Sequence, residues 1–190
     1  MSLYLDRYQP SRSNKDFFDL RTRIRSEIWG WVNLSLFRMV PRQFRGWRRM
    51  LLRIFGCKIG KTSAVGRLAL IERPWNLNVG ERSSIGDNAW VYCLDRITIG
   101  DKVCIGPGAK LITGSHDISS AVFQLTTKPI IVESGSWVAN FATILPGVVI
   151  GEGAVVGTSA VVTKSVAPWT VVAGNPAKVV KQREISLNPK

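Results

Sequence analysis

His116 is the only histidine of the 190-residue chain, and it lies in a long segment between two series of apolar residues. A neutral imidazole can take a proton from a hydroxyl group near pH 7, so it suits the attack of a hydroxyl on an activated acyl group. A nearby carboxylate would fix the tautomer of such a base. Asp95 is the candidate for that carboxylate, although an aspartate at a corner turn is an equally common reason for its presence.

The elements that must position these residues are indicated by an aliphatic residue that recurs every six positions. The longest unbroken series runs from Val132 to Val162, and three shorter series precede it. The fifteen positions are Ile59, Val65, Ile71, Val79, Ile85, Val91, Ile99, Ile105, Leu111, Val132, Val138, Ile144, Ile150, Val156 and Val162. Because a six-residue unit is too small to bury its own apolar face, successive units must stack.

Three such units form one triangular coil, and the coils stack at about the 4.8 Å spacing of paired strands. The pattern predicts an all-β fold, a left-handed parallel β-helix of hexapeptide repeats with about five coils, in spite of the usual right-handed crossover. The six-residue spacing is interrupted by the segments 72–78, 92–98 and 112–131, each time after the third unit of a coil. All three insertions are therefore expected at one corner, and the longest carries His116.

The charge of the chain is concentrated near its beginning. The formal net charge is +13, and residues 1–58, with 13 basic and four acidic residues, account for +9 of it. The spacing of apolar residues predicts two amphipathic helices in this segment, the second over 41–55. Their apolar faces are predicted from Phe17, Leu20, Ile24, Ile28, Trp31 and Leu34 in the first helix and from Phe44, Trp47, Leu51 and Ile54 in the second.

Two interpretations of these helices stay open. They can pack on the first coil as a cap, with their arginines in solvent, or they can contact an anionic membrane surface through residues 14–55. Both can hold at once. Nucleic-acid binding is a weaker alternative, because the chain has no recognised binding module, and we expect no nucleic-acid partner.

Cellular location and metal binding are constrained by simple counts. The opening residues have no apolar signal region, and the longest apolar run, residues 28–40, has 13 residues, fewer than a membrane-spanning helix needs. Cys57, Cys93 and Cys104 show no CxxC spacing, which indicates a reducing compartment. We therefore expect a cytoplasmic protein, peripheral to the membrane if the helices bind it. One histidine per chain cannot supply a three-histidine zinc site, and no metal is expected.

The stretch from Ile99 to Lys181 resembles the hexapeptide-repeat acetyltransferases. The matching segments are TGSHDI (113–118), LPGVVIGEGAVVGTSAVVTKSV (145–166) and VVAGNPAKVVK (171–181). They are similar to the galactoside acetyltransferases and more closely to the colanic-acid-type exopolysaccharide O-acetyltransferases. The resemblance covers roughly residues 55–184. It implies acetyl-CoA as the co-substrate and a homotrimer with its sites between subunits.

The resemblance also implies roles for particular residues. His116 would deprotonate the acceptor hydroxyl for direct attack on the thioester, without an acyl-enzyme. The residues implied to bind acetyl-CoA are Trp137, Asn140 and Thr158 beside the pantetheine arm, Thr163 and Lys164 near the adenosine phosphates, and Lys178 and Lys181 near the 3′-phosphate on a short C-terminal helix. A solvated basic C-terminus and packing of Trp137 at a subunit contact are the structural alternatives.

The acceptor is less constrained, because the polar residues that hold the sugar in galactoside acetyltransferases do not align cleanly with this sequence. The aromatic and polar groups that a sugar would need are supplied by residues of the first two insertions, Trp75, Asn76, Tyr92 and Asp95.

We expect three parts along the chain. They are an N-terminal helical segment over 1–56, an acetyltransferase domain over 57–174 with its inserted loop at 112–131, and a C-terminal helix or tail over 175–190.

Together these features predict an acetyl-CoA-dependent O-acetyltransferase that acts on a carbohydrate, such as an exopolysaccharide precursor. Acetylation of a small soluble acceptor, a free sugar or an antibiotic, is the alternative within enzymes. A β-helix without activity, serving as a scaffold or membrane-docking protein, is the alternative outside them.

Overall fold

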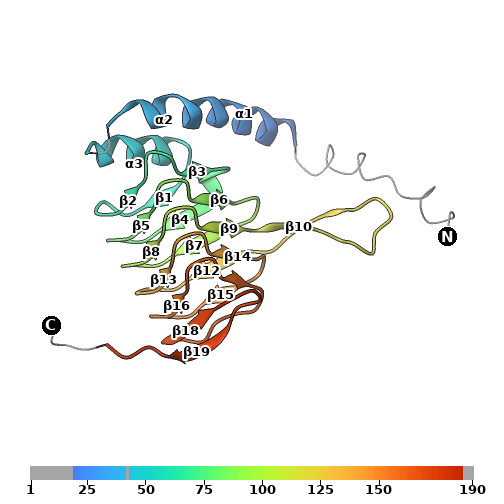
Figure 1. Ribbon diagram of the computed structural model, residues 1–190. Helices are drawn as coiled ribbons and strands as arrows, with labels where there is room; N and C mark the ends of the chain where they lie inside the picture. Colours follow the sequence, from blue (N-terminus) through green and yellow to red (C-terminus); the bar gives the residue numbers. More distant parts are fainter. Residues whose placement is uncertain (1–18, 42, 186–190) are drawn as a thin grey trace.

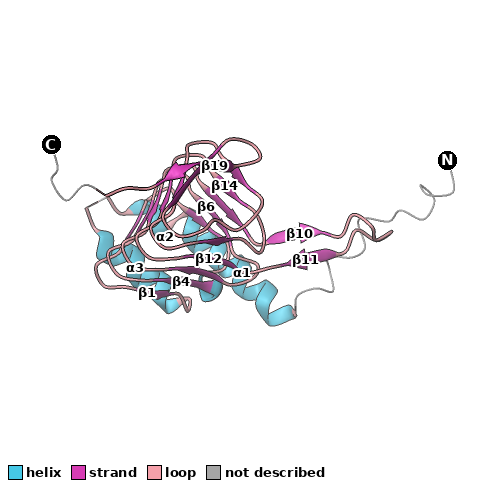
Figure 2. Ribbon diagram, turned by 90° about the horizontal axis from the view of Figure 1, so that it is seen from below, coloured by secondary structure: helices cyan, strands magenta, loops and turns pink. Residues whose placement is uncertain are grey.

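The computed structural model describes residues 19–41 and 43–185 of the chain. Stacked short strands form a parallel β-helix, and helices lie across the end where its first coil begins (Figure 1). One long hairpin projects from the side of the stack (Figures 1 and 2). Phe17 and the other residues before 19 lie outside the described part, as do the residues after 185.

Three sheets, parallel except for the last strand of sheet B, form the sides of the prism. Sheet A consists of β1 (Lys58–Ile59), β4 (Leu77–Val79), β7 (Ile97–Ile99), β12 (Ile130–Val132) and β15 (Val149–Ile150). Sheet B consists of β2 (Ala64–Val65), β5 (Ser84–Ile85), β8 (Cys104–Ile105), β13 (Trp137–Val138), β16 (Val155–Val156), β18 (Thr170–Ala173) and β19 (Lys178–Gln182). Sheet C consists of β3 (Leu70–Ile71), β6 (Trp90–Tyr92), β9 (Lys110–Ile112), β14 (Thr143–Ile144) and β17 (Val161–Val162).

The hexad register predicted from the sequence is confirmed. In sheet A, Ile59 pairs with Val79 and Val79 with Ile99 in the next coils, and the other two sheets continue the same register. All fifteen hexad residues are buried in one continuous core. Glycine follows many of them because the next coil lies against that position: a Cβ added at Gly86 would lie 2.5 Å from the backbone nitrogen of Pro107. Five coils are complete, and a sixth begins at Val166, which forms a parallel bridge with Ile150, and continues in β18.

The helices at the first coil act as its cap. They are α1 (Leu20–Leu34), α2 (Leu36–Met39) and α3 (Arg45–Ile54). Trp29, Phe37 and Leu52 are buried with the core of the β-helix, and the Trp29 ring packs edge-on against Phe37 at 5.9 Å between centroids. The capping interpretation of the N-terminal segment is therefore confirmed.

Arginines of the cap bind the open edge of the β-helix. A first coil has no neighbour above it, so its strands present unpaired carbonyl groups. Arg48 Nε donates to the Val65 carbonyl at 2.9 Å, Arg49 Nη1 to the Ser63 carbonyl at 2.9 Å, and Arg53 Nη2 to the Ile59 carbonyl at 2.6 Å. The expectation that arginines of a capping helix are merely solvated is therefore wrong for these three.

The faces of the two predicted helices also need correction. In α3 the predicted apolar face is only partly buried: Leu51 is buried, whereas Phe44 and Ile54 are exposed. The helix begins at Arg45 rather than at residue 41, since Arg48 Nη1 bonds the Val40 carbonyl at 3.1 Å and holds the chain in a turn before the helix. In α1 the predicted stripe from Leu20 to Leu34 is exposed, because Trp29 and Asn33 form the buried face instead.

The described residues of the C-terminal segment, 175–185, do not form the expected helix. Residues 178–182 form β19, which pairs antiparallel with β18. The physical reason is the open edge of the sheet: β18 ends the parallel stack, and a returning strand satisfies its backbone groups, which a helix does not do.

Candidate functional site

All three insertions lie at the corner between sheets C and A, as the spacing predicted. They follow β3, β6 and β9 of sheet C and precede β4, β7 and β12 of sheet A. The first contains a short 3-10 helix, η2 (Pro74–Asn76), and the third forms an antiparallel hairpin of β10 (Gly114–His116) and β11 (Leu125–Thr127). Figure 2 shows this hairpin projecting outward from that corner.

His116 is fixed at the outer end of β10. It pairs with Leu125 across the hairpin, and its ring is stacked on Phe123 with 4.7 Å between centroids and 13° between planes. Its Nδ1 lies 2.7 Å from the Phe123 carbonyl oxygen. A carbonyl only accepts hydrogen bonds, so this contact places the proton of the neutral ring on Nδ1. Nε2 then keeps the lone pair that a general base requires.

Phe123 was not found by sequence reasoning. Its φ of 52° is unusual for a residue with a side chain, and the reversal of the chain in the hairpin aims its carbonyl at the histidine ring. A backbone carbonyl carries no residue-type signal, and no spacing in the sequence indicated this contact.

Asp95 lies at the same corner, but its observed contacts are local. Its carboxylate accepts from the Arg96 N–H at 2.6 Å, and its own N–H donates to Thr113 Oγ1 at 3.0 Å. Among the hydrogen bonds of residues 19–41 and 43–185, none joins it to His116, whose Nδ1 is engaged by Phe123. The catalytic and acceptor-binding roles of Asp95 stay predictions.

The other predicted acceptor residues lie in the first two insertions. The Nδ2 of Asn76 donates to the carbonyls of Cys93 and Leu94 at 3.1 and 2.8 Å, so its amide holds the two stacked loops together. The Trp75 ring lies under the Arg25 guanidinium, 4.2 Å from its carbon to the ring centroid. The side chains of Asn76 and Trp75 thus make contacts that stabilise the fold, and their roles in binding the acceptor stay predictions.

Tyr92 is the predicted acceptor residue that meets the base of the hairpin. A Cβ added at Gly114 would lie 2.9 Å from Tyr92 Cε1, so the phenol ring packs directly against the start of β10. The ring also lies beside Trp90, with 5.1 Å between centroids. Burial, followed by the neighbouring carboxylate of Glu72, raises the pKa of Tyr92, so its hydroxyl is a hydrogen-bond donor at neutral pH.

The residues predicted to bind acetyl-CoA fall into two groups. Trp137 stands on the outer face of sheet B, 46% exposed, in a row that continues through Val155 and Val171 to Lys181. Asn140 and Thr158 occupy equivalent positions in the turns after β13 and β16, and Lys178 lies on β19 with Lys181. All of these side chains are exposed.

The second group, Thr163 and Lys164, follows β17 of sheet C. It therefore shares the corner between sheets C and A with His116, whereas the first group lies on sheet B or at the corner between sheets B and C. Sheet C separates the two corners. One chain by itself does not bring His116 and Trp137 to the same place.

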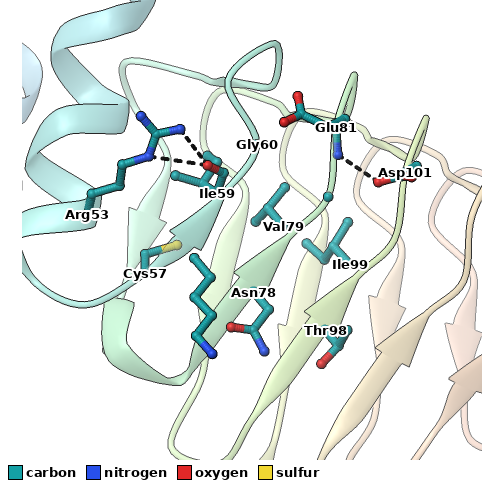
Figure 3. Close-up of a pocket in the computed structure, with 12 residues that line it drawn as sticks. Arg53, Cys57, Ile59, Gly60, Asn78, Val79, Glu81, Thr98, Ile99 and Asp101 are labelled. Carbon is teal, nitrogen blue, oxygen red and sulfur yellow. Dashed lines mark hydrogen bonds between the residues drawn. The ribbon is translucent and has the colours of Figure 1, made fainter.

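A separate pocket lies on the outer face of sheet A, below α3 (Figure 3). Three of its polar side chains bind backbone groups: Arg53 binds the Ile59 carbonyl, Asp101 Oδ1 accepts from the Glu81 N–H at 2.7 Å, and Glu81 accepts from the Lys61 N–H at 2.9 Å. Hydrogen bonds from the Thr62 side chain and from the Thr62 and Lys61 N–H groups lower the pKa of Glu81 to about 2. None of the predicted site residues lines this pocket.

The described residues contain no group of three or more histidine, cysteine, aspartate or glutamate side chains that could hold a metal ion. Cys57 and Cys93 are buried in the core, and this burial raises the pKa of each thiol to about 12. Cys104 lies on the outer face of sheet B and is exposed.

Comparison with known proteins decides the family. Residues 129–164 match the family model described as bacterial transferase hexapeptide (six repeats). The chain is 38% identical over 160 residues to WcaF of Escherichia coli (strain K12), assigned as a colanic acid biosynthesis acetyltransferase, and the match covers 84% of this chain and 88% of WcaF. The chain belongs to the hexapeptide-repeat acetyltransferase family. The predicted family and its acetyltransferase activity are thereby confirmed.

Two further relatives support the fold and the co-substrate. Galactoside O-acetyltransferase of Escherichia coli (strain K12) is 30% identical over 129 residues, 63% of this chain and 64% of that protein. The hexapeptide-repeat acetyltransferase VCA0836 of Vibrio cholerae O1 biovar eltor superposes with a TM-score of 0.81 at 26% identity, covering 96% of this chain and 99% of that one. VCA0836 was solved with acetyl-CoA bound, which agrees with the expected co-substrate. The predicted left-handed β-helix is confirmed by this match.

Proposed function

We propose that this protein transfers the acetyl group of acetyl-CoA to a hydroxyl of a carbohydrate, with an exopolysaccharide precursor as the acceptor and His116 as the general base. The observation that carries the proposal is the hydrogen bond of His116 Nδ1 to the Phe123 carbonyl. It leaves Nε2 of the neutral ring unprotonated, as proton abstraction requires.

In this reaction Nε2 takes the proton of the acceptor hydroxyl while the hydroxyl oxygen attacks the thioester carbonyl. The new C–O bond forms as the C–S bond breaks, and the imidazolium returns its proton to the departing thiolate of CoA. The Phe123 carbonyl, which accepts from Nδ1–H, stabilises the charged ring during the transfer. The acetyl transfer needs no acyl-enzyme intermediate and no further reactant.

The carbohydrate acceptor is supported by the relatives rather than by a pocket. WcaF is assigned to colanic acid biosynthesis and the second relative is a galactoside O-acetyltransferase. Tyr92 is the best-placed aromatic residue for stacking on a sugar ring, since it adjoins the hairpin of His116. We assign it to the acceptor, together with Trp75, Asn76 and Asp95 at the same corner.

Acetyl-CoA would bind between subunits. The two groups of predicted CoA residues lie at different corners of the prism, so a complete site needs Trp137, Asn140 and Thr158 from one copy beside His116 and Thr163 from another. A closed ring of three copies meets this requirement with one site at each contact. Lys164, Lys178 and Lys181 would meet the phosphates of CoA as point charges. The free thiols favour a reducing, cytoplasmic setting for the reaction.

Substitution of the base tests the proposal. His116→Ala should lower the rate of acetyl transfer to a carbohydrate acceptor by at least about 100-fold. The assay combines labelled acetyl-CoA with a panel of glycans and nucleotide sugars. Ser115→Ala, an exposed neighbour in the same strand, is the matched control and should keep its rate.

Binding of CoA, measured by calorimetry, separates loss of chemistry from loss of structure. His116→Ala should bind CoA as the wild type does, because the proposed CoA residues are untouched. An unchanged rate in His116→Ala would refute the general-base role, and failure of the wild type to acetylate any carbohydrate would refute the acceptor class.

A further inference from the structure

Helix α1 presents two opposite faces, and the outer one is unusually apolar. Its inner face is held on the β-helix by Trp29, whose Nε1 donates to the Ile71 carbonyl at 2.5 Å, and by the buried Asn33. The outer face carries a row of large apolar side chains, which we call the outer stripe. The outer stripe consists of Leu20 (68% exposed), Ile24 (52%), Ile28 (53%), Trp31 (76%) and Leu34 (62%).

The spacing of the outer stripe explains its position. At 3.6 residues per turn, positions 20, 24, 28 and 31 lie above one another on one side of a helix, and position 29 lies roughly on the opposite side. The row therefore points away from the first coil across the whole length of α1. Single exposed apolar residues are ordinary, but five on one face of a helix, with only the exposed Glu27 among them, mark a surface that is covered in use.

The charges around the outer stripe identify what covers it. Residues 19–55 contain nine arginines, no lysine and two acidic residues. Some of these arginines serve the fold: Arg25, for example, donates to the Phe55 carbonyl at 2.7 Å. Arg21 and Arg23 are exposed and flank the outer stripe on its two sides. Guanidinium groups bind phosphate oxygens in pairs, which an anionic lipid surface supplies together with hydrocarbon.

We propose that the outer stripe, with Arg21 and Arg23, is the surface by which this protein docks on an anionic phospholipid membrane. The helix lies in the plane of the interface, its aliphatic side chains enter the boundary of the acyl chains, and Trp31 sits at the level of the headgroups. No helix among the described residues is long and apolar enough to cross a bilayer. Contact at the surface requires no such helix.

A second copy of the chain fits the outer stripe less well. A parallel pairing of two outer stripes would bring Arg21 and Arg23 of one copy against the same arginines of the other. An antiparallel pairing would place them against the end of the partner helix, where α1 has no acidic residue, since Glu27 is the only one within it. Like charges at such a contact oppose association. An anionic bilayer offers the opposite charge to Arg21 and Arg23 at the beginning of the row.

Docking through this surface also sets the distance to the proposed catalytic corner. The beginning of α1 lies on the side of the prism from which the hairpin projects (Figures 1 and 2). The hairpin leaves the third coil, which lies about 10 Å below the first coil at the spacing of stacked strands, and the helix layer above the first coil adds about 10 Å. The proposal extends the proposed function, because a carbohydrate linked to a membrane lipid would lie within reach of that corner.

Vesicle flotation of the full-length protein tests the proposal. Vesicles of phosphatidylcholine alone are compared with vesicles that also contain phosphatidylglycerol, at low and at high salt. The wild type should float with the anionic vesicles, and its partition coefficient should fall as salt rises. The double substitution Ile24→Ser and Ile28→Ser should lower the partition coefficient at least tenfold. Arg21→Gln with Arg23→Gln should lower it and weaken its dependence on salt.

The matched control is Val179→Ser with Val180→Ser. These residues are 67% and 62% exposed on β19, at the opposite end of the prism from α1. The control should float like the wild type, and all variants should keep the far-ultraviolet circular dichroism and melting temperature of the wild type, since none of the substituted side chains is buried.

Three results would overturn the proposal. They are a wild type that stays with the soluble fraction in the presence of anionic vesicles, an outer-stripe variant that floats equally well, and an outer-stripe variant whose only change is a smaller assembly in sedimentation. The last result would assign the outer stripe to another copy of the chain. Flotation needs no acetyl transfer, so failure here leaves the proposed activity to be judged by the His116 assay alone.

Discussion

Arg48 offers a sharp test of how the β-helix is closed at its first coil. The side chain is 1% exposed, and its guanidinium donates to the Val65 carbonyl at 2.9 Å and to the Val40 carbonyl at 3.1 Å. Substitution Arg48→Met keeps much of the apolar stem but removes both bonds and the longer contact with the Pro41 carbonyl at 3.5 Å. A hydrogen bond from a charged group contributes about 1.5–3 kcal/mol, so two lost bonds should lower the free energy of unfolding by about 3 kcal/mol or more.

Urea and thermal unfolding followed by circular dichroism measure this loss. For a chain of this size, about 3 kcal/mol corresponds to a fall in melting temperature of roughly 6–12 °C. Arg48→Lys keeps the charge but not the planar fork, and it should recover only part of the loss.

The control is Arg23→Met in α1, where the arginine is exposed. With a net charge of +13, removing an exposed positive charge should leave stability within about 0.5 kcal/mol or raise it slightly. If Arg48→Met were as stable as Arg23→Met, the reasoning that guanidinium groups close the open edge would be refuted.

Three further predictions concern the reactivity of the thiols, the stability of the protein at acid pH and the packing of the hairpin. Iodoacetamide at pH 8 should modify Cys104 in the native protein and leave the two buried thiols intact, as mass spectrometry would show. The pKa of Glu81 is lowered from 4.5 to about 2, so its stabilising effect is present above about pH 4.5 and is lost as the pH falls toward 2. In Glu81→Gln the free energy of unfolding, measured by urea titration, should therefore depend less on pH between these two values. Gly114→Ala should push the hairpin off Tyr92 and lower turnover about tenfold or more, whereas Ser115→Ala should not; equal rates would contradict the packing argument.

The sequence located much of the candidate site because one local rule governs the fold. Each hexad contributes one inward aliphatic residue, and a change of one position would turn that residue out of the core. The register of all three sheets, the shared corner of the insertions and the place of His116 on that corner followed from counting residues. The resemblance to a known family then supplied the candidate CoA residues, which no spacing could indicate.

Contacts between segments distant in the sequence were decided only by the tertiary structure. Arg48 is buried because it completes the open edge of the first coil, and residues 178–182 form a strand because β18 needed a partner. Residue type alone predicts a solvated arginine at the first place, and the family resemblance implied a short helix at the second. The Phe123 carbonyl, which fixes the tautomer of His116, is a backbone group and has no signature in the sequence. Periodicity thus determined where the chain stacks, and unpaired backbone groups at the edges and in the hairpin determined what the remaining side chains do.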